Sequence, residues 1–97
     1  MSNYGDFKLV SRARFSLPPK LFLNGPWTHL ATITRGFKEY VVLLKEDGSS
    51  KIYIEEITGT GQFLHISDES LWRDLVSFAT SVGVTKEILN QEILFAR

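Results

Sequence analysis

The chain has 97 residues, and 43% of them are hydrophobic. This length and hydrophobic content predict one domain over residues 1–97. The net charge is zero, because the sequence has 11 basic and 11 acidic side chains. It contains no cysteine, which excludes disulfides and thiolate metal sites, and its two histidines lie in different segments, so we expect neither a metal nor a cofactor. No apolar run approaches the roughly 20 residues that cross a bilayer and the N-terminus lacks a signal-peptide core, which favours a soluble, cytoplasmic protein without a membrane partner.

The first predicted element is a strand over residues 7–17, after a polar segment at 1–6 that is expected to fray. Its apolar side chains alternate with a cationic face that carries Lys8, Arg12 and Arg14. Three bases on one strand face are able to follow a phosphate backbone, and they are also typical of an edge strand protected against aggregation. Pro18 and Pro19 end this strand, and the structure of residues 18–27 is left open.

Four further strands are predicted over residues 28–34, 37–46, 51–58 and 62–66. Arg35-Gly36 is expected to make a tight turn between the first two of them, and residues 46–50 a turn before the third. Residues 40–44 are apolar on both faces, which places their strand in the middle of the sheet. Gly59-Thr60-Gly61 is interpreted as turn chemistry because no third glycine and no helix follow it.

A helix is predicted over residues 68–82, with Ser67 as its cap and Gly83 after its last turn. Its apolar face is expected to cover the core or to join two subunits, and it comprises Leu71, Trp72, Leu75, Val76, Phe78 and Val82. A short C-terminal helix is predicted over residues 86–95, and a terminal strand over 92–96 is the alternative, because period and length do not separate the two. The expected fold is therefore α+β, with a twisted, mainly antiparallel sheet of about five strands.

The sequence offers no catalytic constellation. Glu55 and Glu56 are neighbours on one strand and point to opposite faces, so they do not form a dyad. The first-turn acids Asp68 and Glu69 are explained by the helix dipole, and a histidine in a strand is usually structural. We therefore expect a non-enzymatic protein.

Charge and aromatic rings suggest a function. Residues 1–52 carry eight Lys and Arg against four acids, and residues 53–97 carry three against seven, although ordinary scatter of surface charge explains such a split as well. Bases and rings interleave across the predicted strands, as on a platform for stacking single-stranded nucleic acid. The candidate nucleic-acid-binding residues are Lys8, Arg12, Arg14, Arg35, Phe37, Lys38, Tyr40, Lys51 and Tyr53. The competing interpretation packs Tyr40 and Tyr53 into the core.

Four antiparallel strands followed by a helix, joined by Ile66-Ser67-Asp68-Glu69-Ser70-Leu71-Trp72-Arg73-Asp74-Leu75, resemble the single-stranded-DNA-binding domain of the positive-cofactor-four transcriptional coactivator family. The resemblance covers roughly Trp27 to Val82. It implies a homodimer built through the helices, with DNA lying along the curved sheets. The strand over residues 7–17 and the zero net charge depart from that pattern.

A second function remains in competition, that of a small protein-interaction or inhibitor module that acts through the acidic helical half or an exposed strand edge. A nucleic-acid binder is expected to gather Arg12, Arg14, Lys38 and Lys51 on one surface beside exposed rings, on the sheet face away from the helix. An interaction module is expected to scatter these charges and to expose an apolar patch or an open edge.

Overall fold

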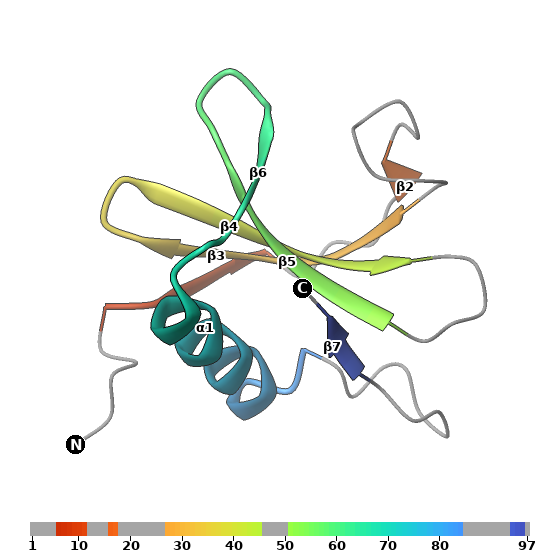
Figure 1. The fold of residues 1–97 in the computed structure, drawn as a ribbon, viewed down its shortest axis with the longest axis vertical. Coiled ribbons are helices and arrows are strands. Elements are labelled where there is room, and N and C mark those ends of the chain that lie inside the picture. Colours follow the sequence, from red (N-terminus) through yellow and green to blue (C-terminus); the bar gives the residue numbers. More distant parts are fainter. Residues whose placement is uncertain (1–5, 12–15, 18–26, 46–50, 85–93, 97) are drawn as a thin grey trace.

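The computed structural model describes residues 6–11, 16–17, 27–45, 51–84 and 94–96. These residues form one domain with seven short or long strands and one helix (Figure 1). The elements are β1 (Lys8–Ser11), β2 (Ser16–Leu17), β3 (Trp27–Arg35), β4 (Lys38–Lys45), β5 (Lys51–Ile57), β6 (Phe63–His65), α1 (Glu69–Ser81) and β7 (Leu94–Ala96). The expectations for residues 1–5, 12–15, 18–26, 46–50 and 86–93 lie outside the described residues.

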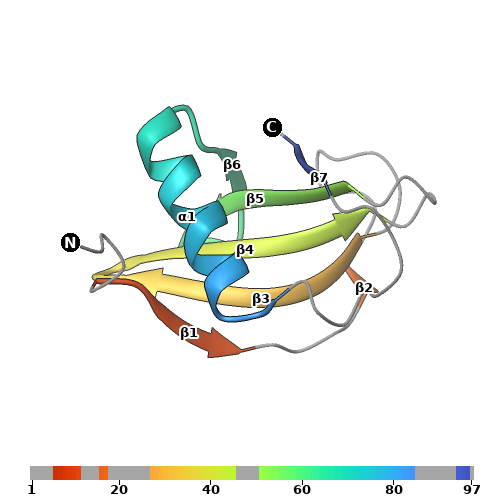
Figure 2. The same ribbon diagram turned by 90° about the horizontal axis from the view of Figure 1, so that it is seen from below.

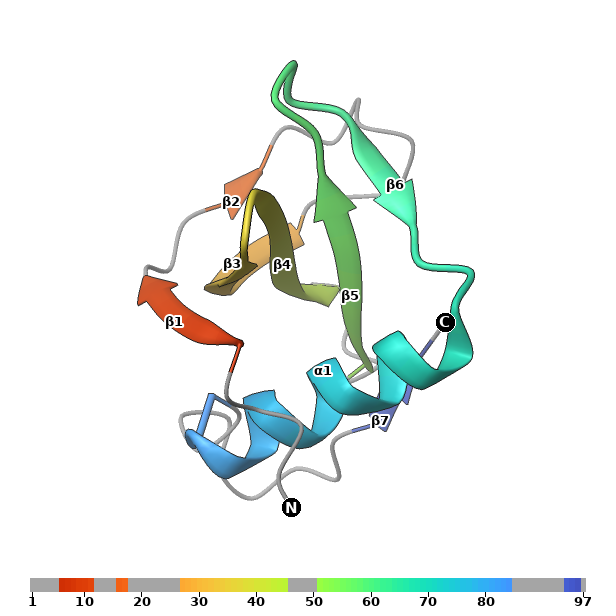
Figure 3. The same cartoon turned by 90° about the vertical axis from the view of Figure 1, so that its left-hand side faces the viewer.

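The sheet has the order β1-β3-β4-β5-β6, with every neighbouring pair antiparallel. β2 pairs with β3 beyond the end of β1, at Ser16 opposite Thr28, so the described parts of the predicted 7–17 strand both line the same edge of β3. The central strands β3, β4 and β5 carry most of the ladder, and Figure 3 shows β1 and β6 at opposite margins of the sheet. The α+β prediction with an antiparallel five-stranded sheet is confirmed.

The C-terminal prediction is wrong where it can be compared. Residues 94–96 form β7, which pairs in parallel with the start of β5 at Ile52 opposite Phe95, whereas a helix was predicted to run to residue 95. The alternative terminal strand is the one found at these residues. The physical reason is tertiary: this edge of β5 offers unpaired backbone groups, and Phe95 packs against the core from there.

Helix α1 begins one residue later than predicted, because Asp68 and not Ser67 is its cap. The Oδ1 atom of Asp68 accepts a hydrogen bond from the backbone N–H of Leu71 at 3.2 Å, which satisfies one of the amides left open at a helix start. The helix ends at Ser81, one residue earlier than predicted, and Gly83 follows its cap in the left-handed region at φ 76°, as predicted.

Two apolar clusters flank the sheet. Figure 2 shows α1 lying across one face, where Leu75, Phe78 and Ala79 pack on Ile33, Val42, Ile54 and their neighbours. The other sheet face, called here the opposite face, holds a second buried cluster of Trp27, Val41, Leu43 and Phe63. Residues 40–43 are therefore buried on both sides, as their continuous apolar run predicts.

Candidate functional site

The β3–β4 turn presents one fully exposed aromatic ring. Arg35 pairs with Lys38, which leaves Gly36 and Phe37 as the two turn residues, and Gly36 adopts φ 63°, a conformation that favours glycine. Phe37, predicted as the first residue of a strand, lies in this turn, and no part of its side chain is covered. We call residues 35–38 the hairpin tip.

Both cations at the hairpin tip contact another side chain. The guanidinium carbon of Arg35 lies 5.5 Å from the ring centroid of Phe7, within the range of a cation–π contact. Lys38 Nζ lies 3.4 Å from Glu56 Oε2 across the sheet. The numbers of basic and acidic side chains are equal among the described residues at this end of the sheet. The bases are Lys8, Arg35 and Lys38, and the acids are Asp6, Glu39 and Glu56.

The predicted stacking rings do not share a face. Tyr40 stands opposite Ile33 and Glu56 on the helix side and is only 1% exposed, and burial, the main cause, raises the pKa of its hydroxyl. Tyr53 pairs with Leu43 across β4 and β5, and its side chain lies on the opposite face, away from α1. Tyr40 is therefore a core residue, and the prediction that its ring stacks on a base is wrong because no face of it reaches solvent.

The predicted bases are likewise divided among the described residues. Lys51 is exposed at the start of β5. It lies about 20 Å along this strand from Ile57, which pairs with Glu39 near the hairpin tip. The hairpin tip with Phe37 contains two of the predicted bases, Arg35 and Lys38, and Lys8 of β1 lies at the same end of the sheet. Arg12 and Arg14 lie outside the described residues.

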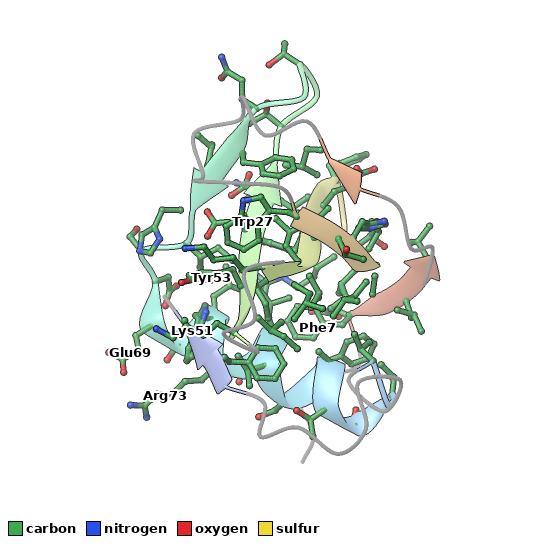
Figure 4. All side chains as sticks on the ribbon, turned by 90° about the vertical axis from the view of Figure 1, so that its right-hand side faces the viewer. Phe7, Trp27, Lys51, Tyr53, Glu69 and Arg73 are labelled. Atoms are coloured by element: carbon green, nitrogen blue, oxygen red, sulfur yellow. The ribbon has the colours of Figure 1, made fainter. Side chains whose placement is uncertain are left out.

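The apolar residues of α1 have the core role that the sequence predicts. Leu75 and Phe78 are buried, and the partly buried members pack against the same cluster, namely Leu71, Trp72, Val76 and Val82. On the exposed side, Arg73 and Glu69 form an ion pair of 2.6 Å one turn apart, which is visible at the margin of Figure 4. Such exposed pairs contribute less than about 1 kcal/mol.

Sequence reasoning missed a buried polar group on the opposite face. Glu55 stands between Val41 of β4 and His65 of β6 and is 3% exposed, and burial raises the pKa of its carboxyl to about 7. The only available signal was its place in the middle of an apolar strand, two residues from Tyr53 and from Ile57. Glu56 does face the other side, as predicted, because it stands opposite Tyr40.

His29 is the second buried polar residue of that face. Its Nε2 lies 2.7 Å from Thr32 Oγ1, and burial lowers the pKa of its imidazole, although a backbone hydrogen bond involving Ala31 acts in the other direction. The neutral ring is therefore favoured, and His29 has the structural role that the sequence suggests. His65, on β6, is exposed.

Within the residues described, no three His, Asp or Glu side chains gather in a way that would hold a metal ion. In the same part of the chain, no helix is long and apolar enough to cross a membrane. No family model, curated protein or solved structure matches the chain.

Proposed function

We propose that this chain is a protein-interaction module that uses the hairpin tip as its recognition element and Phe37 as the anchor. The observation that carries the proposal is the full exposure of the Phe37 ring at a turn where a polar residue would serve the backbone equally well. Aromatic anchors that enter a partner's pocket supply much of the binding energy in protein interfaces.

The charges around Phe37 favour a protein partner over a polyanion. Bases and acids are balanced at this end of the sheet, and Lys38 already has Glu56 as an ion-pair partner. A phosphate backbone is attracted by a surplus of positive charge, whereas a protein pocket is compatible with a mixed rim.

Two further exposed apolar residues support the same class of function. Val10 lies on β1 and Leu64 on β6, and these strands form the two margins of the five-stranded path. No other described strand pairs with the outer edge of β1 or of β6, so each margin combines such an edge with an apolar side chain, a combination through which a partner strand is able to add to a sheet.

The test compares Phe37→Ser with Lys51→Ser, a change of an exposed residue at the start of β5, about 20 Å along that strand from the hairpin tip. Partners are first sought with the wild-type chain, and each candidate is then purified and titrated against all three proteins. We expect Phe37→Ser to weaken binding by about 30-fold, as for an aromatic anchor worth roughly 2 kcal/mol, with folding unchanged. Equal affinity of the wild type and Phe37→Ser for every purified partner would remove Phe37 as the anchor.

A single-stranded nucleic-acid binder of the kind that the family resemblance implies is the second candidate. The arrangement that favours it is local: Arg35, Phe37 and Lys38 are nearly consecutive, and Lys8 lies at the same end. One exposed ring with three nearby cations would stack one base and bind weakly. The homodimer through α1 belongs to this candidate and stays a prediction.

Anisotropy titrations of labelled single-stranded DNA and RNA at low and moderate salt decide between the two candidates. Binding that falls steeply with salt and is lost in Phe37→Ala would support the second, because phosphate contacts release counterions. Absence of binding at low salt would remove it. Light scattering in the same buffers measures whether the chain is a dimer.

A further inference from the structure

The opposite face of the sheet contains two buried polar atoms without hydrogen-bond partners among the described residues. One is Oε1 of Glu55, whose residue is 3% exposed, and the other is Nε1 of Trp27, whose residue is 2% exposed. Leaving such groups unpaired costs about 1–3 kcal/mol each, and more for an ionised carboxylate. One is an acceptor that lacks a donor, and the other is a donor that lacks an acceptor.

An aromatic corner that includes Trp27 lies on the same sheet face as Glu55. The rings of Trp27 and Tyr53 meet edge to face, with centroids 4.9 Å apart and an interplanar angle of 81°. Figure 4 shows Trp27, Tyr53 and Lys51 following one another along this face. Tyr53 is only partly buried, so the corner reaches the surface there. Glu55 follows Tyr53 by two residues on the same side of β5, which separates their Cβ atoms by about 7 Å.

We infer that this corner is a binding site for a small organic ammonium compound that also carries a hydroxyl or carbonyl oxygen. The ammonium group donates to Glu55 Oε1 and lies against the faces of Trp27 and Tyr53, which attract cations. The ligand's oxygen accepts the hydrogen bond from Trp27 Nε1. The site lies on a different sheet face from the contacts of Arg35 and Lys38, so it does not depend on the role proposed for Phe37.

Burial of Glu55 makes binding depend on pH. The carboxyl has a pKa of about 7 because it is desolvated, and a bound cation favours its ionised form, so binding releases a proton near neutral pH. Affinity is therefore expected to rise by about tenfold from pH 6 to pH 8 and to level off above that.

Other charged and titratable residues lie on the same sheet face as Glu55, and their effect on the pH dependence has to be distinguished from that of Glu55. They are His29 of β3, Glu39 and Lys45 of β4, Lys51 and Tyr53 of β5, and His65 of β6. Of these, the exposed His65 is the direct neighbour across the ladder, opposite Glu55. A His65→Asn variant that keeps the pH dependence would assign the proton to Glu55.

The experiment titrates the protein with ethanolamine, ethylamine and ethylene glycol and follows the indole N–H resonance of Trp27. Ethanolamine carries both required groups, ethylamine lacks the oxygen, and ethylene glycol lacks the charge. We expect ethanolamine to shift the Trp27 resonance at millimolar concentrations, ethylamine to bind more weakly, and ethylene glycol to have no effect. In Glu55→Gln, which removes the charge and keeps the shape, the tenfold pH dependence and most of the affinity are expected to be lost.

Three outcomes would overturn the inference. The Trp27 resonance stays unchanged with ethanolamine at pH 8, ethylene glycol shifts it as strongly as the amines, or Glu55→Gln binds ethanolamine like the wild type. Because Glu55→Gln removes a buried ionisable group, it is expected to fold at least as well as the wild type, so its loss of binding is not a loss of structure.

Discussion

Replacing Glu55 by glutamine is expected to stabilise the protein at neutral and higher pH and to change little in acid. The pKa of Glu55 lies at about 7 in the folded chain against 4.5 in its ordinary environment, because the carboxyl is buried between Val41 and His65. The folded state therefore binds more protons than the unfolded state between these values, and stability falls as pH rises through them. At 1.36 kcal/mol per pKa unit, the full loss is about 3 kcal/mol, reached above pH 7.

The assay is urea unfolding of the wild type and of Glu55→Gln at a series of pH values between 5 and 8. His29 contributes a slope of the opposite sign, since burial lowers its pKa and its protonation in acid favours the unfolded chain. This contribution is present in both proteins, so the difference between their free energies of unfolding isolates Glu55. That difference is expected to grow from near zero in acid to about 3 kcal/mol above pH 7.

Glu56→Gln is the matched control, because the neighbouring carboxylate faces the helix side and pairs with the exposed Lys38. Loss of this ion pair is expected to change stability by less than about 1 kcal/mol. If the wild type and Glu55→Gln keep a constant difference from acid to alkaline pH, the carboxyl of Glu55 is not desolvated, and the reasoning fails together with the pH dependence expected for the ammonium site.

Two further changes test the helix. Leu75→Ala removes a fully buried side chain of α1 from the core and is expected to lower the free energy of unfolding in urea by about 2–5 kcal/mol. The control Ser77→Ala, at an exposed position of α1, is expected to change it by less than about 0.5 kcal/mol. A similar effect of both changes would mean that α1 does not pack on the sheet. Asp68→Ala removes the cap of α1 and is expected to cost about 1 kcal/mol in thermal unfolding, with most of the stability kept in Asp68→Asn. An equal loss in both variants would contradict the capping role.

Local sequence patterns predict most of the elements because the forces that form them are local. The alternation and turn residues around β4 and β5 place both strands within two residues of their observed ends. The helical spacing from Leu71 to Val82 and the glycine at position 83 predict the length of α1. The N-terminal boundary of α1 is less well determined, since Ser67 and Asp68 are both capable caps and only the position of the Leu71 amide selects Asp68.

The candidate sites are less predictable because they depend on register between strands. Tyr40 and Tyr53 each lie on a strand with an accompanying lysine, which suggests one surface of rings and bases. The pairing of Val42 with Ile54 instead sends Tyr40 to the helix side and Tyr53 to the opposite face. A one-residue change of register exchanges the two faces of a strand, and no feature within either strand reports that register.

The hairpin tip depends both on local sequence and on the pairing of strands. The residues Arg35-Gly36-Phe37-Lys38 predict a tight turn with an aromatic residue nearby, and the full exposure of Phe37 at the end of the sheet follows from the pairing of Arg35 with Lys38. Local sequence patterns therefore specify the α+β class, the central hairpins and the covering helix, because periodicity and turn chemistry are encoded within each segment. Only the tertiary structure buried Glu55 beside an aromatic corner, joined residues 94–96 to β5 and left Phe37 uncovered, because desolvation and edge pairing depend on residues distant in the chain.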